Sequence, residues 1–234
     1  METQSLALGL IWYIVFLFST TCHEAAHAMV AKLGGDLTAF HGGQVSLNPV
    51  PHIRREPIGL VIVPILSFIL AHWMIGWASA PYDPSWRERY PRRAAWMALA
   101  GPGANFALML IAAIGIRTGM ALGVFHPPQA ASFTQITQVN AGGPEFAATF
   151  LSILFVENLL LGTFNLIPVP PLDGNSGITL LMSERVALRF AEFSRGQLAF
   201  AGIILAWYLY GKIFMILFQV ALNALYPGAH YGSG

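Results

Sequence analysis

The residue pattern with the clearest chemistry is HEAAH, from His23 to His27, near the end of the first long apolar run at 6–31. On a helix, side chains four positions apart lie one turn apart on the same face. His23 and His27 would therefore offer two imidazoles to one metal ion. Glu24 between them would lie beside a water molecule activated by that metal and take its proton. The pattern predicts a zinc site equipped for hydrolysis.

A catalytic zinc site ordinarily has three protein ligands, so the two histidines need a partner. Asp173 is the candidate, in the proline-rich segment NLIPVPPLDGN at 165–175. An aspartate at membrane depth costs about 2.5–3.5 kcal/mol on insertion scales, and a metal ion compensates for that cost. The prolines free the local backbone from helical pairing, which lets the carboxylate turn toward the metal.

Two less specific interpretations compete with this one. An aspartate before glycine is commonly a turn residue, which is the alternative for Asp173. A pair of histidines in an apolar helix can be buried structural hydrogen-bonders. Glu24 argues against that second interpretation, because three ionisable groups clustered in hydrocarbon are costly without a function.

Composition places these residues in a membrane protein. The chain has 234 residues, 56% of them apolar, and only 10% are charged, against about 25% in a typical soluble protein. Mean hydropathy is +0.60. We expect one integral membrane domain at 1–231, with 232–234 set aside as an appended tail. The net charge of +1 gives no nucleic-acid signal, and the single cysteine excludes an internal disulfide or a cysteine metal cluster.

The elements that would position the site are mostly apolar helices of membrane length. Four spanning helices are predicted, at 5–32, 94–116, 146–166 and 197–226. Residues 36–56 are rich in Gly and Pro with short β-prone pieces, and predict one or two short strands at the membrane surface. Residues 177–193 are amphipathic and predict a helix lying in the interface.

Residues 57–80 form a further apolar stretch, interrupted by Pro64, His72 and Gly76. Seven basic residues lie between the first two predicted core helices: Lys32, Arg54, Arg55, Arg87, Arg89, Arg92 and Arg93. The positive-inside rule keeps them on one side only if 57–80 enters and leaves the membrane on the same side. We therefore predict a re-entrant hairpin, an N-terminus outside and the histidines near the cytoplasmic face. Helices 5–32 and 146–166 then run the same way, which puts Asp173 at the histidines' depth.

Together with HEAAH, the motifs GPGAN at 101–105 and PPLDG at 170–174 make the chain resemble the site-2 protease family of intramembrane zinc metalloproteases. The resemblance covers roughly 15–200 and is closest to compact prokaryotic members without a PDZ or CBS domain. It implies that His23, His27 and Asp173 bind one Zn²⁺ per chain, with Glu24 as the general base. It also implies that Asn105 and Asn165 line the cleft, where they would hold substrate backbone or stabilise the oxyanion.

The expected fold is an all-α polytopic membrane protein. It has a three-helix catalytic core, a re-entrant hairpin, a short surface β element and a C-terminal transmembrane helix. The family's surface β element, matched to 36–56, would hold an extended substrate by strand addition.

The expected function is zinc-dependent cleavage of single-span membrane proteins in or near their transmembrane segments, in the cell membrane, as in regulated intramembrane proteolysis. One alternative is a catalytically silent member that binds membrane segments as a regulator or chaperone; the intact Glu24 argues against it. Another is a zinc carrier, which would need polar residues spread across the membrane depth. The residues predict no oligomeric state.

Overall fold

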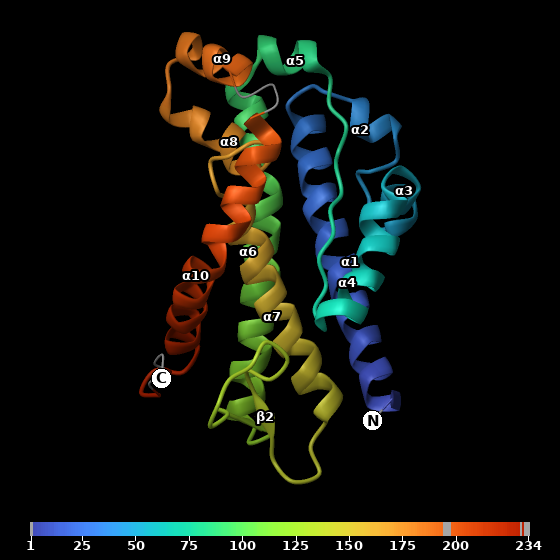
Figure 1. Cartoon of the computed structure of the whole chain (residues 1–234), viewed down its shortest axis with the longest axis vertical. Helices are drawn as coiled ribbons and strands as arrows, with labels where there is room; N and C mark the ends of the chain where they lie inside the picture. Colours follow the sequence, from blue (N-terminus) through green and yellow to red (C-terminus); the bar gives the residue numbers. More distant parts are fainter. Residues whose placement is uncertain (1, 194–197, 230, 232–234) are drawn as a thin grey trace.

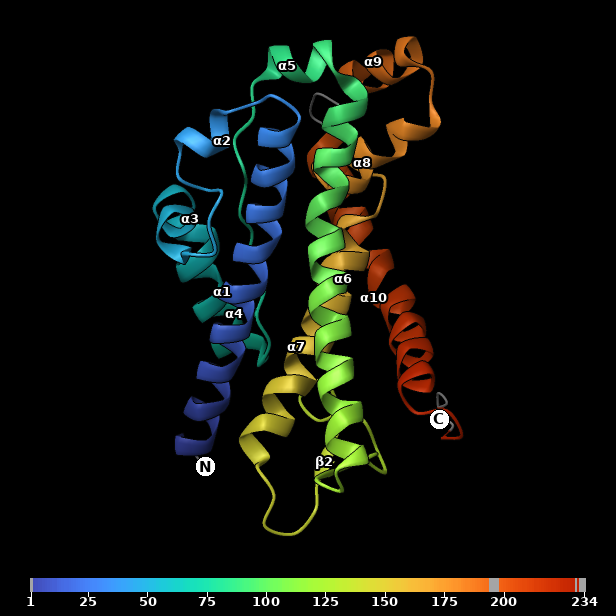
Figure 2. The ribbon, with the colours of Figure 1, turned by 180° about the vertical axis from the view of Figure 1, so that it is seen from behind.

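Three long helices pack side by side at the centre of the computed structural model, which describes residues 2–193, 198–229 and 231 (Figures 1 and 2). They are α1 (Glu2–Leu33), α6 (Pro91–Ala121) and α7 (Glu145–Asn165). Among the described residues, three segments are long and apolar enough to cross a membrane: Leu6–Leu33, Pro91–Ala121 and Glu145–Asn165. The predicted three-helix core and all-α class are confirmed.

Shorter elements surround this core. They are α2 (Thr38–His41), α3 (Pro49–Arg55), the π-helix η1 (Ile58–Ile62), α4 (Val63–Ala71), α5 (Pro84–Arg89), β1 (Phe125–His126), β2 (Gln138–Val139), α8 (Asp173–Gly177), the 3-10 helix η2 (Ile178–Leu181), α9 (Glu184–Phe193) and α10 (Leu198–Leu225). The predicted tail at 232–234 and the first residue of the predicted domain lie outside the described residues.

α1 and α7 run in the same direction and α6 runs against them, as both views show (Figures 1 and 2). The Asn158 side chain joins the two parallel helices at one depth, where its Nδ2 donates to Ser19 Oγ at 2.8 Å. Apolar side chains such as Phe16 and Ile153 fill the core around this bond. The parallel course carries the histidine end of α1 and the segment after α7 to the same end of the molecule.

The strands predicted within 36–56 are wrong, because the described structure has α2 and α3 there. At α3 a helix cap outweighs β propensity. The Asn48 side chain accepts a hydrogen bond from the Val50 N–H at 3.0 Å, and Pro49 occupies the first helical position, where its missing N–H costs nothing. The structure's short antiparallel sheet, β1 with β2, lies instead in the loop between α6 and α7.

Residues 57–80 form the predicted in-and-out hairpin (Figure 1). η1 and α4 run alongside α1, and the chain then turns at His72, whose φ of 58° is left-handed. Residues 73–83, the return segment, run back in an extended course to α5. The two arms pack tightly, since a Cβ on Gly76 would overlap the Gly59 carbonyl oxygen. The Trp77 N–H donates to that same oxygen at 3.2 Å.

The return segment ends at α5, which lies across the same end of the molecule as the last turn of α1 and the first turn of α6 (Figure 1). Asp83 caps α5 by accepting from the Ser85 N–H at 2.8 Å. Hydrogen bonds from Ser85 hold the pKa of the Asp83 carboxyl below its ordinary value. Trp86 Nε1 and Arg93 Nη1 each donate to the Gly34 carbonyl at 3.0 Å, which ties the three elements together.

α10 matches the predicted C-terminal helix at 197–226 almost residue for residue. It packs on α7 through aromatic side chains, with Phe164 edge-on to both Trp207 and Tyr210. The described apolar part of α10, Tyr210–Leu225, is shorter than a membrane span. That α10 crosses the membrane therefore stays a prediction.

Candidate metal centre

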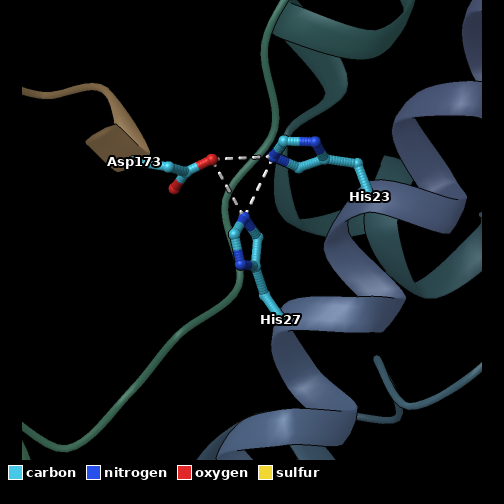
Figure 3. Close-up of side chains that lie close together, drawn as sticks. All are labelled: His23, His27 and Asp173. Carbon is cyan, nitrogen blue, oxygen red and sulfur yellow. Dashed lines mark hydrogen bonds and ion pairs between the residues drawn. The ribbon is translucent and has the colours of Figure 1, made fainter. Parts of the chain in front are cut away.

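The side chains of His23, His27 and Asp173 converge on one point (Figure 3). Both histidines come from α1, and Asp173 begins α8, reached through the proline-rich break after α7. Asp173 Oδ2 lies 3.1 Å from His23 Nε2 and 3.3 Å from His27 Nε2, and the two Nε2 atoms are 2.9 Å apart. Tetrahedral zinc with bonds of about 2.0–2.2 Å requires ligand separations of roughly 3.3–3.5 Å, close to this triangle.

The hydrogen bond of His27 Nδ1 determines that Nε2 is the ring nitrogen free to bind a metal. His27 Nδ1 lies 2.7 Å from the Met97 carbonyl oxygen, on α6. A carbonyl oxygen only accepts hydrogen bonds, so Nδ1 carries the proton. In the neutral ring, Nε2 then has a bare lone pair directed at the centre of the triangle.

The side-chain amides of Asn158 and Asn105 fix the tautomer of His23 in the same way. The Leu154 carbonyl can only accept, so the Asn158 Nδ2 that lies 2.8 Å away is its donor. Asn158 Oδ1 consequently faces Asn105 and accepts from its Nδ2 at 2.9 Å. This leaves Asn105 Oδ1 to accept from His23 Nδ1, at 2.6 Å. His23 Nε2 therefore also presents a lone pair to the centre.

The two Nε2 atoms and Asp173 Oδ2 lie 2.9–3.3 Å from one another. Three lone pairs at these distances repel one another unless a cation lies between them. Two imidazoles and one carboxylate form the donor set of many catalytic zinc sites, and their outer hydrogen bonds are the support such ligands have. The residues present therefore fit a zinc ion. Gly101 of α6 completes the fit, because a Cβ at that position would overlap both imidazole rings.

Glu24 lies beside this centre and is only 4% exposed. Its Oε2 is buried and has no hydrogen-bond partner among the described residues. Glu24 and the three converging residues all line one cavity of about 810 Å³. A buried carboxylate next to the point where a metal fits is placed to accept a proton from a water molecule there.

The cavity lies between α1, α7, α10 and the return segment of the hairpin. Its walls are mainly apolar, and among them are Phe16 of α1, Leu160 of α7, Trp207 of α10 and Met74 of the return segment. A cavity with such walls suits an apolar ligand.

The two predicted cleft asparagines have different positions. Asn165 lines the cavity, with its Nδ2 donating to the Leu161 carbonyl at 3.0 Å. Asn105 is fully buried behind His23 and does not line the cavity. The prediction that Asn105 lines the cleft is therefore wrong, and the side chain instead positions a histidine.

Several residues of the site escaped the sequence interpretation. The Met97 carbonyl carries no sequence signal, since any residue there has one. Gly101 belonged to a recognised motif, but its contact with the histidines requires the packing of α6 on α1. Asn158 had a signal, because a polar residue inside an apolar span marks a functional position by default.

This geometry defines a class: a metalloprotease-type centre set among helices of membrane length. The chain matches the model of peptidase family M50 over residues 11–209, and it belongs to that family. The family resemblance predicted from the motifs is thereby confirmed.

One relative is "Putative zinc metalloprotease YwhC" of Bacillus subtilis (strain 168). It is 32% identical to this chain over 189 residues, which cover 79% of this chain and 76% of the relative. The search of solved structures found no significant match. The protein is thus a multi-pass membrane protein of a metalloprotease family.

Proposed function

We propose that this protein is a zinc-dependent endopeptidase that cleaves single-span membrane proteins within or near their transmembrane segments. The observation that carries the proposal is the meeting of three lone pairs, from His23, His27 and Asp173, beside the buried Glu24. They meet inside a mainly apolar cavity between membrane-length helices. Zinc is the metal we propose, one ion per chain.

Each residue has a defined task in this reaction. His23, His27 and Asp173 hold the metal, and the hydrogen bonds to Met97 and Asn105 keep the histidine lone pairs aimed at it. When bound, zinc supplies a Lewis acid that lowers the pKa of a water molecule toward ~7 and polarises a peptide carbonyl. Glu24 takes the proton of the attacking water and later delivers it to the leaving amine.

The return segment of the hairpin supports an extended substrate conformation. The Ile75 N–H donates to Ser67 Oγ at 3.1 Å, the Trp77 N–H donates to Gly59, and the Ser79 carbonyl accepts from Arg55 Nε at 3.0 Å. Backbone groups alternate sides in a stretched chain, so those of the even-numbered residues point the other way. We propose that the substrate pairs with this free edge, a role the sequence had assigned to 36–56.

A substrate helix has to unwind before it can pair with that edge, because an intact helix uses its own carbonyls in i to i−4 bonds. Helix-weakening residues in the substrate would therefore favour cleavage. The basic end of the molecule, with α5 and the first turn of α6, would face the cytoplasm by the positive-inside rule. The N-terminus would then lie outside, and cleavage near the cytoplasmic face would suit regulated intramembrane proteolysis.

The test uses purified, zinc-loaded full-length protein and a panel of single-span peptides. We expect cleavage that stops with a chelator and returns with zinc. Glu24→Gln should keep one zinc per chain but cleave at least about a hundredfold more slowly. Glu145→Gln, which alters an exposed carboxylate on α7, is the matched control and should cleave like wild type. Wild-type rates from Glu24→Gln, or no cleavage of any peptide by zinc-loaded wild type, would refute the proposal.

A further inference from the structure

A second polar position lines the same cavity, and the reaction described above does not use it. Glu157 of α7 is 3% exposed, and neither of its carboxyl oxygens has a hydrogen-bond partner among the described residues. Thr20 of α1 also lines the cavity, and its buried Oγ1 has no partner there either. Unsatisfied buried polar groups destabilise a fold, so a ligand that satisfies them binds with a corresponding gain.

Glu157 and Thr20 lie within about 3 Å of the same depth, because α1 and α7 are parallel and rise about 1.5 Å per residue. Their chain neighbours Asn158 and Ser19 are bonded to each other across α1 and α7, at 2.8 Å. The two unpartnered groups therefore flank one section of the cavity from two helices. Thr20 precedes His23 by three residues, which is about 4.5 Å along the helix axis. An extended substrate advances about 3.3 Å per residue, so this section faces a side chain one or two residues from the reacting peptide bond.

The chemistry of the two groups selects the ligand. A carboxyl group that is buried without a cation is held in its neutral form, so it donates one hydrogen bond and accepts another, and a threonine hydroxyl can do the same. A carboxamide offers both complements, because its NH₂ donates and its oxygen accepts. An ammonium group only donates, and an aliphatic side chain does neither.

Resting on the proposed function, we infer that Glu157 and Thr20 form a specificity subsite for an Asn or Gln side chain of the substrate, one or two residues from the cleaved bond. The subsite lies on the side of the metal centre nearer the N-terminus of α1. It selects substrates without taking part in the proton transfers. A polar residue in an otherwise apolar transmembrane segment then becomes the recognition mark for cleavage.

The experiment uses single-span peptides with one guest residue, placed at each of the three positions on either side of the mapped cleavage bond. The guests are Leu, Gln, Glu and Lys. At one of these positions we expect wild type to cleave the Gln peptide about tenfold faster than the Leu peptide, the size of one buried hydrogen bond. The Glu guest should be disfavoured there, since its charge would have to leave water for a buried site without a cation.

Variants assign that preference to the subsite. Glu157→Leu should bring the ratio of Gln to Leu cleavage to one or below. Glu157→Gln should keep part of the preference, because its amide also donates and accepts hydrogen bonds. Thr20→Val should lower the ratio a few-fold. Glu145→Leu, a matched change at an exposed position of the same helix, should leave the ratio at its wild-type value.

A binding arm separates this inference from the proposed function. The Glu24→Gln protein should bind the Gln peptide about tenfold more tightly than the Leu peptide, and the added change Glu157→Leu should remove that difference. Cleavage with no guest preference, a Lys preference over Gln, or an unchanged ratio in Glu157→Leu would overturn the subsite and leave the peptidase standing. Selective binding by Glu24→Gln together with no cleavage of any peptide by zinc-loaded wild type would refute the peptidase and leave the subsite standing.

Discussion

Glu157 and Asn158 are neighbours on α7 and both are buried, but their side chains differ in hydrogen bonding. The Asn158 amide is bonded to Ser19, to the Leu154 carbonyl and to Asn105, and through Asn105 it orients His23. Glu157 has no hydrogen-bond partner among the described residues. One side chain completes a closed polar network, while the other lies in a cavity wall with both oxygens unsatisfied.

The difference distinguishes polar groups that position a metal centre from polar groups that recognise a substrate. A metal centre needs ligands held within a few tenths of an ångström, so every supporting group is paired and the geometry is rigid. A recognition subsite needs groups that are still available when the substrate arrives, and that availability lowers the stability of the free protein. Three predictions test this contrast, from the largest expected effect to the smallest.

The rigid side of the contrast is tested at Gly101. A Cβ there would overlap both imidazole rings, whereas Gly103, two residues on, has open space around it. We expect Gly101→Ala to lose zinc and at least about a hundredfold of the cleavage rate, because small displacements of catalytic groups have effects of that size. Gly103→Ala should match wild type. Elemental analysis and peptide cleavage measure both, and a full zinc equivalent in active Gly101→Ala would contradict the structure.

A substitution at Asn105 tests the hydrogen bonds that support His23, one of the proposed metal ligands. Asn105→Leu leaves His23 Nδ1 without its acceptor, so the tautomer that points a lone pair at the metal is no longer held. We expect zinc affinity to fall about 10–100-fold, the usual effect of losing such a partner. Competition with a chelator of known affinity measures the change. Asn223→Leu, at an exposed position of α10, serves as the control, and equal affinities in the two variants would argue against the role of Asn105.

The smallest effects concern stability and have opposite signs at the two neighbours. Asn158→Leu should destabilise the protein by about 1–3 kcal/mol, since it removes the side-chain partner of the buried Asn105 amide and of the buried Ser19 hydroxyl. Glu157→Leu should stabilise it by about 1 kcal/mol or more, because an unpaired buried carboxyl is replaced by an apolar group. Thermal unfolding in detergent, with zinc chelated so that metal binding does not contribute, gives both values. Shifts of the same sign would remove the distinction between the two residues.

The convergence of His23, His27 and Asp173 was predictable because their signals are local or nearly so. The spacing of His23 and His27 depends only on helix geometry, and Asp173 is conspicuous in a proline-rich break after an apolar helix. The hairpin at 57–80 followed from the distribution of basic residues, and its re-entry into the membrane stays a prediction. The strands expected in 36–56 failed because local side-chain hydrogen bonds, to Asp36 at the start of α2 and to Asn48 at the start of α3, favour helical turns over weak β propensity.

Asn105 and Glu157 show why other assignments needed coordinates. Both are polar residues in apolar helices, so the sequence marks each as a candidate for function. Whether such a side chain faces the cavity, supports a ligand or remains unpaired depends on how its helix is rotated against two others. That rotation is set by packing among α1, α6 and α7, between residues far apart in the chain.

The amino-acid sequence alone determined that the protein is built from membrane-length helices, and it marked His23, His27 and Asp173 as the triad that we propose binds a metal, with Glu24 as the proposed general base. It did so because hydrophobic length and the four-residue helical spacing are properties of short segments. Tertiary structure alone decided the tautomer of each histidine, the exclusion of any side chain at Gly101 and the unpaired state of Glu157. Those features arise only where separate helices meet, and no single segment contains them.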